Sequence, residues 1–287
     1  MPSTLFIGLG RMGAPMATNH SEAFATKVSD LSKEAVAQVA ENSPATAADM
    51  TEPLDCIDTV ILMLPSSRQV EETLTGENGL FTRLHSGSLV IDMSSSEPES
   101  TRRLAGMASA MGIDYVDAPV SGGVPKARTG ELSILVGGTE HSVARAMPHL
   151  EVLGTTIIHV GGEGAGDAAK AINNLVSASN IAIACEALCM AENFGIAPEK
   201  MAEVLNSATG RSQASEVKIT KYILPRSFTS GFAYDLMLKD MTIARGIAEA
   251  LDVPVTSAAF AKLNDGRGTL GQVPDHTEIA RLYGLDD

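Results

Sequence analysis

Short apolar runs bounded by turn residues recur through the first half of the chain, and they constrain the fold more than any other feature. Six such runs are LFIG, TVILMLP, SLVIDMS, IDYVDAPV, LSILVGG and TIIHVGG. Runs this short and continuous are typical of strands buried on both faces. Helix-compatible segments such as RMGAPMATNH and SKEAVAQVAEN lie between several of them. The alternation predicts an α/β fold with a doubly wound parallel sheet.

The pattern changes near residue 162. Residues 165–193 read AGDAAKAINNLVSASNIAIACEALCMAEN, with no proline and one glycine, which predicts one long helix. Further helix-length segments follow, without clear strands. We therefore expect an α/β domain over residues 1–162 and an all-helical domain, built on the long helix, over residues 163–287.

Three glycines, Gly8, Gly10 and Gly13, follow the first apolar run in the sequence GLGRMG. In a GxGxxG motif the first glycine makes a tight turn, the second lets the main chain approach a pyrophosphate, and the third lets helix and strand pack closely. The phosphates would lie on the free N–H groups of the helix that begins near Arg11. Because the motif joins a predicted strand to a predicted helix, it indicates a Rossmann-type dinucleotide-binding domain rather than an ordinary glycine-rich turn.

The choice of dinucleotide depends on Asp30, which lies 22 residues after Gly8 at the end of the second predicted strand, in KVSDLSKEA. Such a carboxylate accepts hydrogen bonds from the ribose 2′-OH and repels a 2′-phosphate. No arginine follows it, although Lys33 is near enough to tolerate the phosphate. NAD is the expected cofactor, and NADP is the alternative.

Lys170 is the most informative residue of the long helix, because no charged side chain occurs between it and Glu186. A helix that is apolar on nearly every face is expected to be buried, in a domain core or an oligomer interface. Burial lowers the pKa of a lysine, as a proton-transferring group near neutral pH requires. Asn174, four residues on, shares the same helical face. The alternative is a solvated surface lysine.

Two further segments are candidates for ligand contacts. Ser121, Gly122 and Gly123, here called the SGG turn, follow an apolar strand and combine a hydroxyl with exposed backbone N–H groups. Such a turn binds an anion, for example a carboxylate, unless it is a plain turn into the next strand. Lys239 and Asp240 in DLMLKDM read, by themselves, as an ordinary ion pair on a helix surface.

Composition excludes several classes of function. The formal net charge is -14, with 21 Lys+Arg against 35 Asp+Glu, so nucleic-acid binding is not expected. Three cysteines, Cys56, Cys185 and Cys189, and scattered histidines show no metal-ligand spacing. The start has no basic leader and continues directly into the glycine motif, unlike a signal peptide. We expect a cytoplasmic protein that binds neither membranes nor metals.

Four segments, FIGLGRMGAPMA, DAPVSGG, GAGDAAKAINN and LMLKD, resemble in this order the signature segments of the β-hydroxyacid dehydrogenase family, which includes 3-hydroxyisobutyrate dehydrogenase. The resemblance spans nearly the whole chain. It implies an NAD(P)-dependent oxidoreductase that interconverts a small β-hydroxy acid and its semialdehyde. It also implies a Rossmann domain followed by a helical domain, as the pattern predicts.

The resemblance assigns cofactor contacts to loops that follow the strands. Leu64 and Pro65 would lie along the cofactor, and Ser95 would border the nicotinamide. The loop that binds the pyrophosphate would comprise Gly8, Leu9, Gly10, Arg11, Met12 and Gly13.

The resemblance likewise implies roles at the reacting centre. The SGG turn would hold the substrate carboxylate, and Lys170 would be the general acid or base. Asn174 would help to fix substrate and lysine, and Lys239 would reach both cofactor and substrate.

Departures from the family pattern leave the substrate open. Gln213 lies where many 3-hydroxyisobutyrate dehydrogenases have an aromatic residue, and the segments ILPRSFTSGF and DHTEIARLYG look more like the tartronate semialdehyde reductase branch. An imine reductase or a catalytically silent cofactor sensor are alternatives of other classes, and Lys170 argues against both. Because the long helix needs extensive cover, we expect a homodimer or homotetramer formed through the helical halves.

Overall fold

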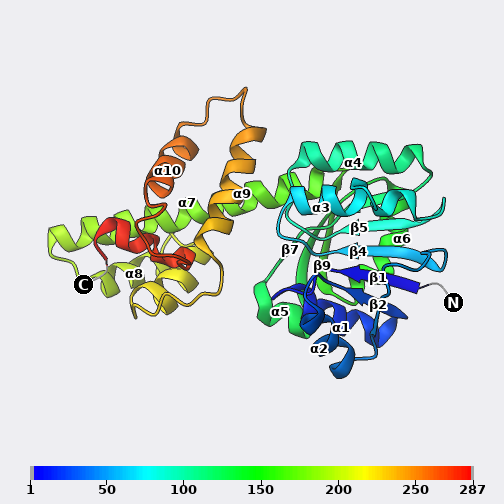
Figure 1. Cartoon of the computed structure of the whole chain (residues 1–287). Coiled ribbons are helices and arrows are strands. Elements are labelled where there is room, and N and C mark those ends of the chain that lie inside the picture. The colour runs from blue at the N-terminus through cyan, green and yellow to red at the C-terminus, as the bar shows by residue number, and fades with distance from the viewer. Residues whose placement is uncertain (1–2, 286–287) are drawn as a thin grey trace. The chain divides into compact units, whose positions relative to one another are not determined.

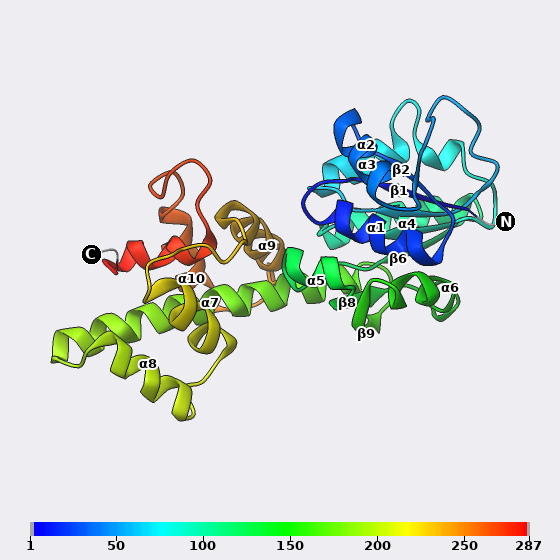
Figure 2. The same cartoon turned by 90° about the horizontal axis from the view of Figure 1, so that it is seen from below.

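The computed structural model describes residues 3–285. The chain divides into two compact units, Met1–Lys170 and Ala171–Asp287. The colours of Figures 1 and 2 follow the chain, so the first unit runs from blue to green and the second from green to red. The first unit is built around a sheet, and the second consists of helices and loops.

One sheet organises the first unit. Within residues 3–285 it has nine strands, in the order β3-β2-β1-β4-β5-β6-β8-β7, with β9 paired to β8. The strands are β1 (Ser3–Ile7), β2 (Thr26–Ser29), β3 (Thr46–Ala47), β4 (Ile57–Leu62), β5 (Leu89–Asp92), β6 (Asp114–Asp117), β7 (Val120–Ser121), β8 (Leu132–Gly137) and β9 (Gly154–Gly161). The six apolar runs all form strands, which confirms the Rossmann-type fold class.

The sheet is mixed, whereas the alternation predicted a parallel one. Strands β3 to β6 are parallel, but β8 runs antiparallel to both β6 and β7. Only the short helix α5 (Gly123–Thr129) separates β7 from β8. A parallel return needs a crossover of about a dozen residues or more, so this connection reverses the chain instead. Helix α6 (Glu140–Glu151) then provides the crossover that makes β9 parallel to β8.

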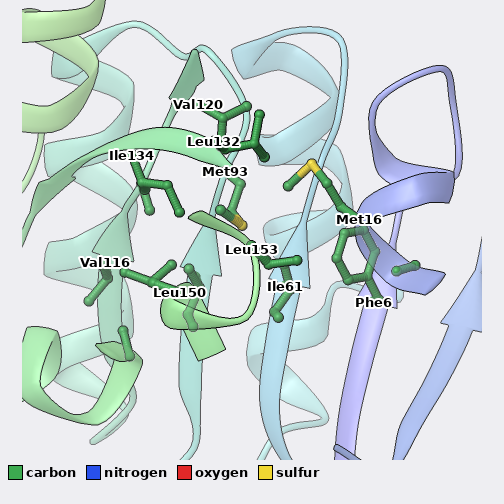
Figure 3. Close-up of a cluster of buried hydrophobic side chains, with 14 of the residues drawn as sticks. Phe6, Met16, Ile61, Met93, Val116, Val120, Leu132, Ile134, Leu150 and Leu153 are labelled. Atoms are coloured by element: carbon green, nitrogen blue, oxygen red, sulfur yellow. The ribbon is translucent and has the colours of Figure 1, made fainter. Parts of the chain in front are cut away.

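Strand β1 shows why the apolar runs are continuous. Phe6 enters the core on one face of the sheet, whereas its neighbours Leu5 and Ile7 enter the core on the other face. Figure 3 shows the first of these cores, where Phe6 lies near Met16 and Ile61. The helices that complete the first unit are α1 (Gly13–Ala23), α2 (Lys33–Asn42), α3 (Ser67–Thr75), η1 (Leu80–Thr82) and α4 (Pro98–Ala110), besides α5 and α6.

Helix α7 (Ala165–Phe194) is the long helix that the sequence predicts, and it continues from the first unit into the second. The second unit packs Cys185 and Leu188 of α7 against Ile219 and Met241 in its own core. Its other helices are α8 (Pro198–Ser207), the π-helix η2 (Ala214–Ile223), α9 (Tyr234–Ile247), α10 (Pro254–Asp265) and the 3₁₀ helix η3 (His276–Tyr283).

One face of α7 stays exposed within the single chain, although the sequence predicted burial on nearly every side. Ile172, Val176, Ile183, Met190 and Phe194 are between 44% and 84% exposed. Their spacings of 4, 7, 7 and 4 residues place them in one stripe. By length and composition α7 is also apolar enough to cross a membrane, a test that core helices of soluble proteins pass as well.

His20, which is buried, and His149, which is half-buried, form a hydrogen-bonded relay with threonines of β2 and β4. The Nδ1–H of His149 donates to Nε2 of His20 (2.9 Å), and the Nδ1–H of His20 donates to Oγ1 of Thr26 (2.8 Å). Thr26 in turn donates to the carbonyl of Phe24, and Thr59 donates to Nε2 of His149. Every donor finds an acceptor only when both rings are neutral. Burial is the main cause that lowers the pKa of His20 to about 3 and that of His149 to about 4.

We expect both rings to remain neutral in the folded protein well below pH 6. An unfolded histidine titrates near pH 6.5. Between pH 6.5 and about 4 these two histidines are therefore protonated in the unfolded chain but neutral in the folded chain. The free energy of unfolding contributed by the relay therefore falls as pH falls through this window. Titration of the ring signals by NMR measures this directly. A folded-state pKa near 6.5 for His20 or His149 would contradict it.

Candidate functional site

The loop between β1 and α1 needs its glycines for different reasons. A Cβ on Gly8, which has a φ of +97°, would overlap the carbonyl of Met63, and a Cβ on Gly13 would overlap the carbonyl of Gly8. A Cβ on Gly10 would meet no atom within 4 Å. Gly8 and Gly13 therefore allow backbone segments to approach each other closely, whereas Gly10 faces open space. No side chain caps the N-terminus of α1, and its first turn has no acidic residue, as suits anion binding.

Asp30 follows β2 and contacts this loop directly. Its Oδ2 accepts a hydrogen bond from the N–H of Leu9 (2.6 Å), and its Oδ1 accepts one from the N–H of Ser32 (2.8 Å). The next side chain, Leu31, is fully exposed. A carboxylate and an apolar surface thus lie together beside the glycine loop.

The other predicted cofactor residues lie at the same edge of the sheet. Leu64 and Pro65 follow β4, and Ser95 follows β5. The N–H of Leu64 donates to Oγ of Ser94 (2.9 Å), which links these two loops. Strands β1, β2, β4 and β5 are parallel, so the structure brings these loops together at their carboxyl ends. The strand order reverses between β1 and β4, the place where doubly wound sheets bind ligands.

The SGG turn joins β7 to α5. Its glycines have φ values of +131° and +68°, which side-chain-bearing residues rarely adopt. The side chain of Asn19 on α1 donates to the carbonyl of Ala127 on α5 (2.9 Å). The helix that follows the SGG turn therefore packs on the helix that follows the glycine loop.

Lys170 lies in the second turn of α7 and is buried, as its place in an apolar segment predicts. Three buried aspartates surround the start of this helix, and the sequence analysis did not single them out. Asp92 ends β5, Asp117 ends β6, and Asp167 lies in the first turn of α7. The available signal was that an aspartate closes each of two apolar strands, in LVID and DYVD.

Hydrogen bonds to these carboxylates fix the start of α7. Asp117 accepts from the N–H groups of Gly164 (2.8 Å) and Asp167 (2.9 Å). Asp167 accepts from the N–H of Ser96 (2.9 Å) and the hydroxyl of Thr101 (2.7 Å). The turn that precedes Lys170 is thereby tied to the loop that contains Ser95.

Burial opposes ionisation of all three carboxylates. Burial raises the pKa of Asp117 to about 6 and raises that of Asp167 well above its usual range. Burial also raises the pKa of Asp92, against the effect of hydrogen bonds from Ser94 and Ser96. Mutual repulsion adds to the shift of Asp117 and Asp167. The cluster therefore retains protons at pH values where surface aspartates have lost them.

In the second unit the structure joins Asn174 to α9. The Nδ2 of Asn174 donates to Oδ2 of Asp240 (2.5 Å), and the Oδ1 of Asn174 accepts from Asn173 (3.2 Å). Asp240 is almost fully buried and lies 3.8 Å from the Nζ of Lys239. The expectation of an ordinary surface ion pair is wrong for Asp240. Its carboxylate instead orients the amide of Asn174.

The fold and these loops define a Rossmann-type nucleotide-binding oxidoreductase, and the comparisons with known proteins agree. Residues 4–161 match the family described as "NAD binding domain of 6-phosphogluconate dehydrogenase". Residues 164–283 match "NAD-binding of NADP-dependent 3-hydroxyisobutyrate dehydrogenase". The chain belongs to the 3-hydroxyisobutyrate dehydrogenase, or β-hydroxyacid dehydrogenase, family and is an NAD(P)-dependent hydroxyacid dehydrogenase.

Individual relatives differ in the acid that they are named for. The chain is 39% identical to the 2-(hydroxymethyl)glutarate dehydrogenase of Eubacterium barkeri, over 89% of this chain and 85% of that protein. It is 38% identical to the 2-hydroxy-3-oxopropionate reductase of Escherichia coli, over 98% and 96%. The solved 3-hydroxyisobutyrate dehydrogenase of Mycobacterium tuberculosis with L-serine has a TM-score of 0.87 at 28% identity, over 98% of each chain.

The glycine loop fits a dinucleotide, because Gly10 alone of its three glycines has no protein atom in the place of a side chain. No group of three or more histidine, cysteine or acidic side chains that would suit a metal occurs within residues 3–285.

Gly10→Ala and Gly13→Ala form a matched test of this loop. Gly10→Ala is expected to leave the free energy of unfolding unchanged and to weaken NAD(H) binding about 10-fold or more, the effect of roughly 1.4 kcal/mol. Gly13→Ala is expected to destabilise the fold by about 1–3 kcal/mol, because its methyl group overlaps the backbone. Chemical denaturation without cofactor and fluorescence titration with NADH measure the two effects. Equal loss of stability in both variants would refute the assignment of Gly10.

Proposed function

We propose that the protein interconverts a small β-hydroxy acid and its semialdehyde with NAD, as a 3-hydroxyisobutyrate dehydrogenase does, with Lys170 as general acid or base. The observation that carries the proposal is the buried Lys170 on a helix whose first turn is bound, through Asp167, to the loop of Ser95. In this division of labour residues 1–162 bind the cofactor and residues 163–287 contribute to the substrate side.

The bound nicotinamide supplies the hydride chemistry. During oxidation the neutral amine of Lys170 takes the proton of the substrate hydroxyl, and during reduction the ammonium returns it. The SGG turn holds the substrate carboxylate through its hydroxyl and backbone N–H groups. Asn174, whose amide Asp240 fixes, orients the substrate and the lysine. Lys239 contacts the cofactor and the substrate.

A second candidate is the reduction of 2-hydroxy-3-oxopropionate, that is, tartronate semialdehyde. It is supported by the relative of that name, which covers nearly the whole of both chains. An exposed Gln213, in place of an aromatic residue, also favours a polar substrate. Both candidates use the same proton transfer and differ only in the group beside the reacting carbon.

Lys170→Met tests the proton transfer. The variant keeps an apolar side chain of similar length, so the fold and NADH binding are expected to persist, whereas kcat falls roughly 10²- to 10⁴-fold. In the wild type the rate of oxidation rises with pH, because the neutral amine accepts the proton, and the rate of reduction falls. Steady-state assays of 3-hydroxyisobutyrate, serine, glycerate and the semialdehydes measure both. The exposed Lys200→Met is the control. Near-wild-type turnover by Lys170→Met would favour the sensor hypothesis.

The cofactor preference follows from Asp30 and Leu31. Losing a hydrogen bond to the ribose costs about 1.5–3 kcal/mol, so kcat/KM with NADH is expected to exceed that with NADPH by about 10-fold or more. The double variant Asp30→Ala with Leu31→Arg removes the repulsion and adds a phosphate partner, and it should reverse the order. Initial rates measured with NADH and with NADPH, for the wild type and the double variant, test this preference. Equal rates for the wild type would show that Asp30 does not select the cofactor.

The exposed stripe of α7 supports a homodimer or homotetramer in solution. Five large apolar side chains in one row form a patch of the kind that monomers rarely leave in water. A second copy of the same helix is an apolar partner of the same length. In this proposal the enzyme is cytoplasmic, soluble and free of nucleic-acid and membrane partners.

A further inference from the structure

Asp117, at the end of β6, is a fully buried acid that takes no part in the proposed proton transfer. Its Oδ1 accepts a hydrogen bond from the N–H of Gly164 (2.8 Å), and its Oδ2 accepts one from the N–H of Asp167 (2.9 Å). Both donors are backbone groups, which cannot turn into acceptors. The ionised carboxylate satisfies both, whereas an amide or a protonated carboxyl at this position would carry a hydrogen that needs an acceptor of its own.

Asp167, in the first turn of α7, has partners of a different kind. Its Oδ1 accepts from the N–H of Ser96 (2.9 Å), and its Oδ2 lies 2.7 Å from the Oγ1 of Thr101 on α4. A hydroxyl either donates or accepts, and its hydrogen rotates to suit the partner. Asp167 is therefore satisfied as a neutral acid, with Oδ1 accepting from Ser96 and the protonated Oδ2 donating to Thr101.

The electrostatics of the two aspartates agree with this difference. Burial and the charge of Asp117 raise the pKa of Asp167 well above its usual range, whereas burial raises the pKa of Asp117 to about 6. Titratable side chains that interact with Asp117 are Asp92 on β5, Tyr115 on β6 and Asp167 on α7. Lys170 lies one turn beyond Asp167. At neutral pH Asp117 is therefore ionised while Asp167 keeps its proton.

Close packing holds the carboxylate of Asp117 against the start of α7. A Cβ on Gly137 of β8 or on Gly166 of α7 would overlap its oxygens, so the side chain has little room to turn away. The residue joins the end of a central strand to the first turn of the helix. Because Lys170 follows Asp167 by a single helical turn, a shift of this turn also displaces the lysine.

We propose that Asp117 is a positioning residue for the reaction: its ionised carboxylate fixes the first turn of α7 and thereby the place of Lys170, while Asp167 acts beside it as a neutral acid. The proposal rests on the proposed function, in which Lys170 transfers the proton. Two neighbouring buried aspartates thus have different charge states. They are therefore expected to respond differently to the same substitution.

Asp117→Asn and Asp167→Asn form a matched pair. The first variant turns an amide hydrogen toward a backbone N–H, so kcat is expected to fall about 10- to 100-fold, the effect of a displacement of about 1 Å at the reacting centre. The second accepts from Ser96 and donates to Thr101 as the neutral acid does, so most of kcat is expected to remain. The exposed Asp55→Asn is the control. Equal losses of kcat in the matched pair would overturn the proposal.

The pH profile of semialdehyde reduction tests the charge of Asp117 without requiring Asp117→Asn to fold. Reduction uses protonated Lys170, so titration of this lysine alone makes the rate rise as pH falls. Because Asp117 must be ionised, the rate is expected to fall again below about pH 6, while circular dichroism shows an intact fold. Asp92→Asn removes a charge that raises the pKa of Asp117, so this acid limb moves to lower pH. Absence of the limb, or a limb that Asp92→Asn leaves in place, would contradict the proposal.

Hydrogen exchange separates this proposal from the proposed function. The backbone amides of residues 164 and 167 are expected to be protected in the wild type and in Asp167→Asn, and to exchange about 10-fold or more faster in Asp117→Asn. If no hydroxy acid is oxidised but this difference is found, the reaction is wrong and the role of Asp117 at the start of α7 stands. If Asp117→Asn oxidises hydroxy acids at the wild-type rate, the reaction stands and the positioning role is wrong.

Discussion

The position of Lys170 depends on carboxylates that the fold buries, and three of them lie around the start of its helix. Asp92 and Asp117 end neighbouring parallel strands, and Asp167 opens α7. Buried carboxylates require donors, and here the donors are backbone N–H groups of the segments that must be held in place. Two glycines near these carboxylates are required for the same reason. A Cβ on Gly137 or Gly166 would overlap the carboxylate of Asp117.

Burying three carboxylates costs stability, but the hydrogen bonds that they accept also fix the positions of the segments that donate them. Because burial and repulsion raise the pKa values of Asp117 and Asp167, the cluster keeps protons to higher pH than surface aspartates do. Asp167 and Lys170 lie one helical turn apart, so a helix fixed at the first residue is also fixed at the second. The same carboxylate holds Ser96, the neighbour of Ser95. One buried group therefore connects the predicted nicotinamide loop with the predicted proton carrier.

Local patterns in the sequence predicted the features that depend on neighbours along the chain. The apolar runs predicted the strands, the uninterrupted residues 165–193 predicted α7, and GLGRMG predicted the turn from β1 to α1. The carboxylate cluster joins residues 92, 117 and 167, and the bond from Asn174 to Asp240 joins two helices. Neither leaves a periodic signal. The direction of β8 depends on how short α5 is, which apolar runs alone do not reveal.

The two units differ in how completely they satisfy their own polar groups. In the first unit the buried aspartates and the histidine relay all find donors or acceptors within the fold. The buried side-chain atoms that lack partners among residues 3–285, namely Asn206 Oδ1, His276 Nε2 and Tyr283 OH, all lie in the second unit. A nucleotide-binding unit binds one cofactor, and its affinity is higher when its polar groups are already held in place before the cofactor binds. In the second unit the desolvation of these three atoms is left uncompensated by the described residues, so its polar groups cost more free energy on folding than those of the first unit.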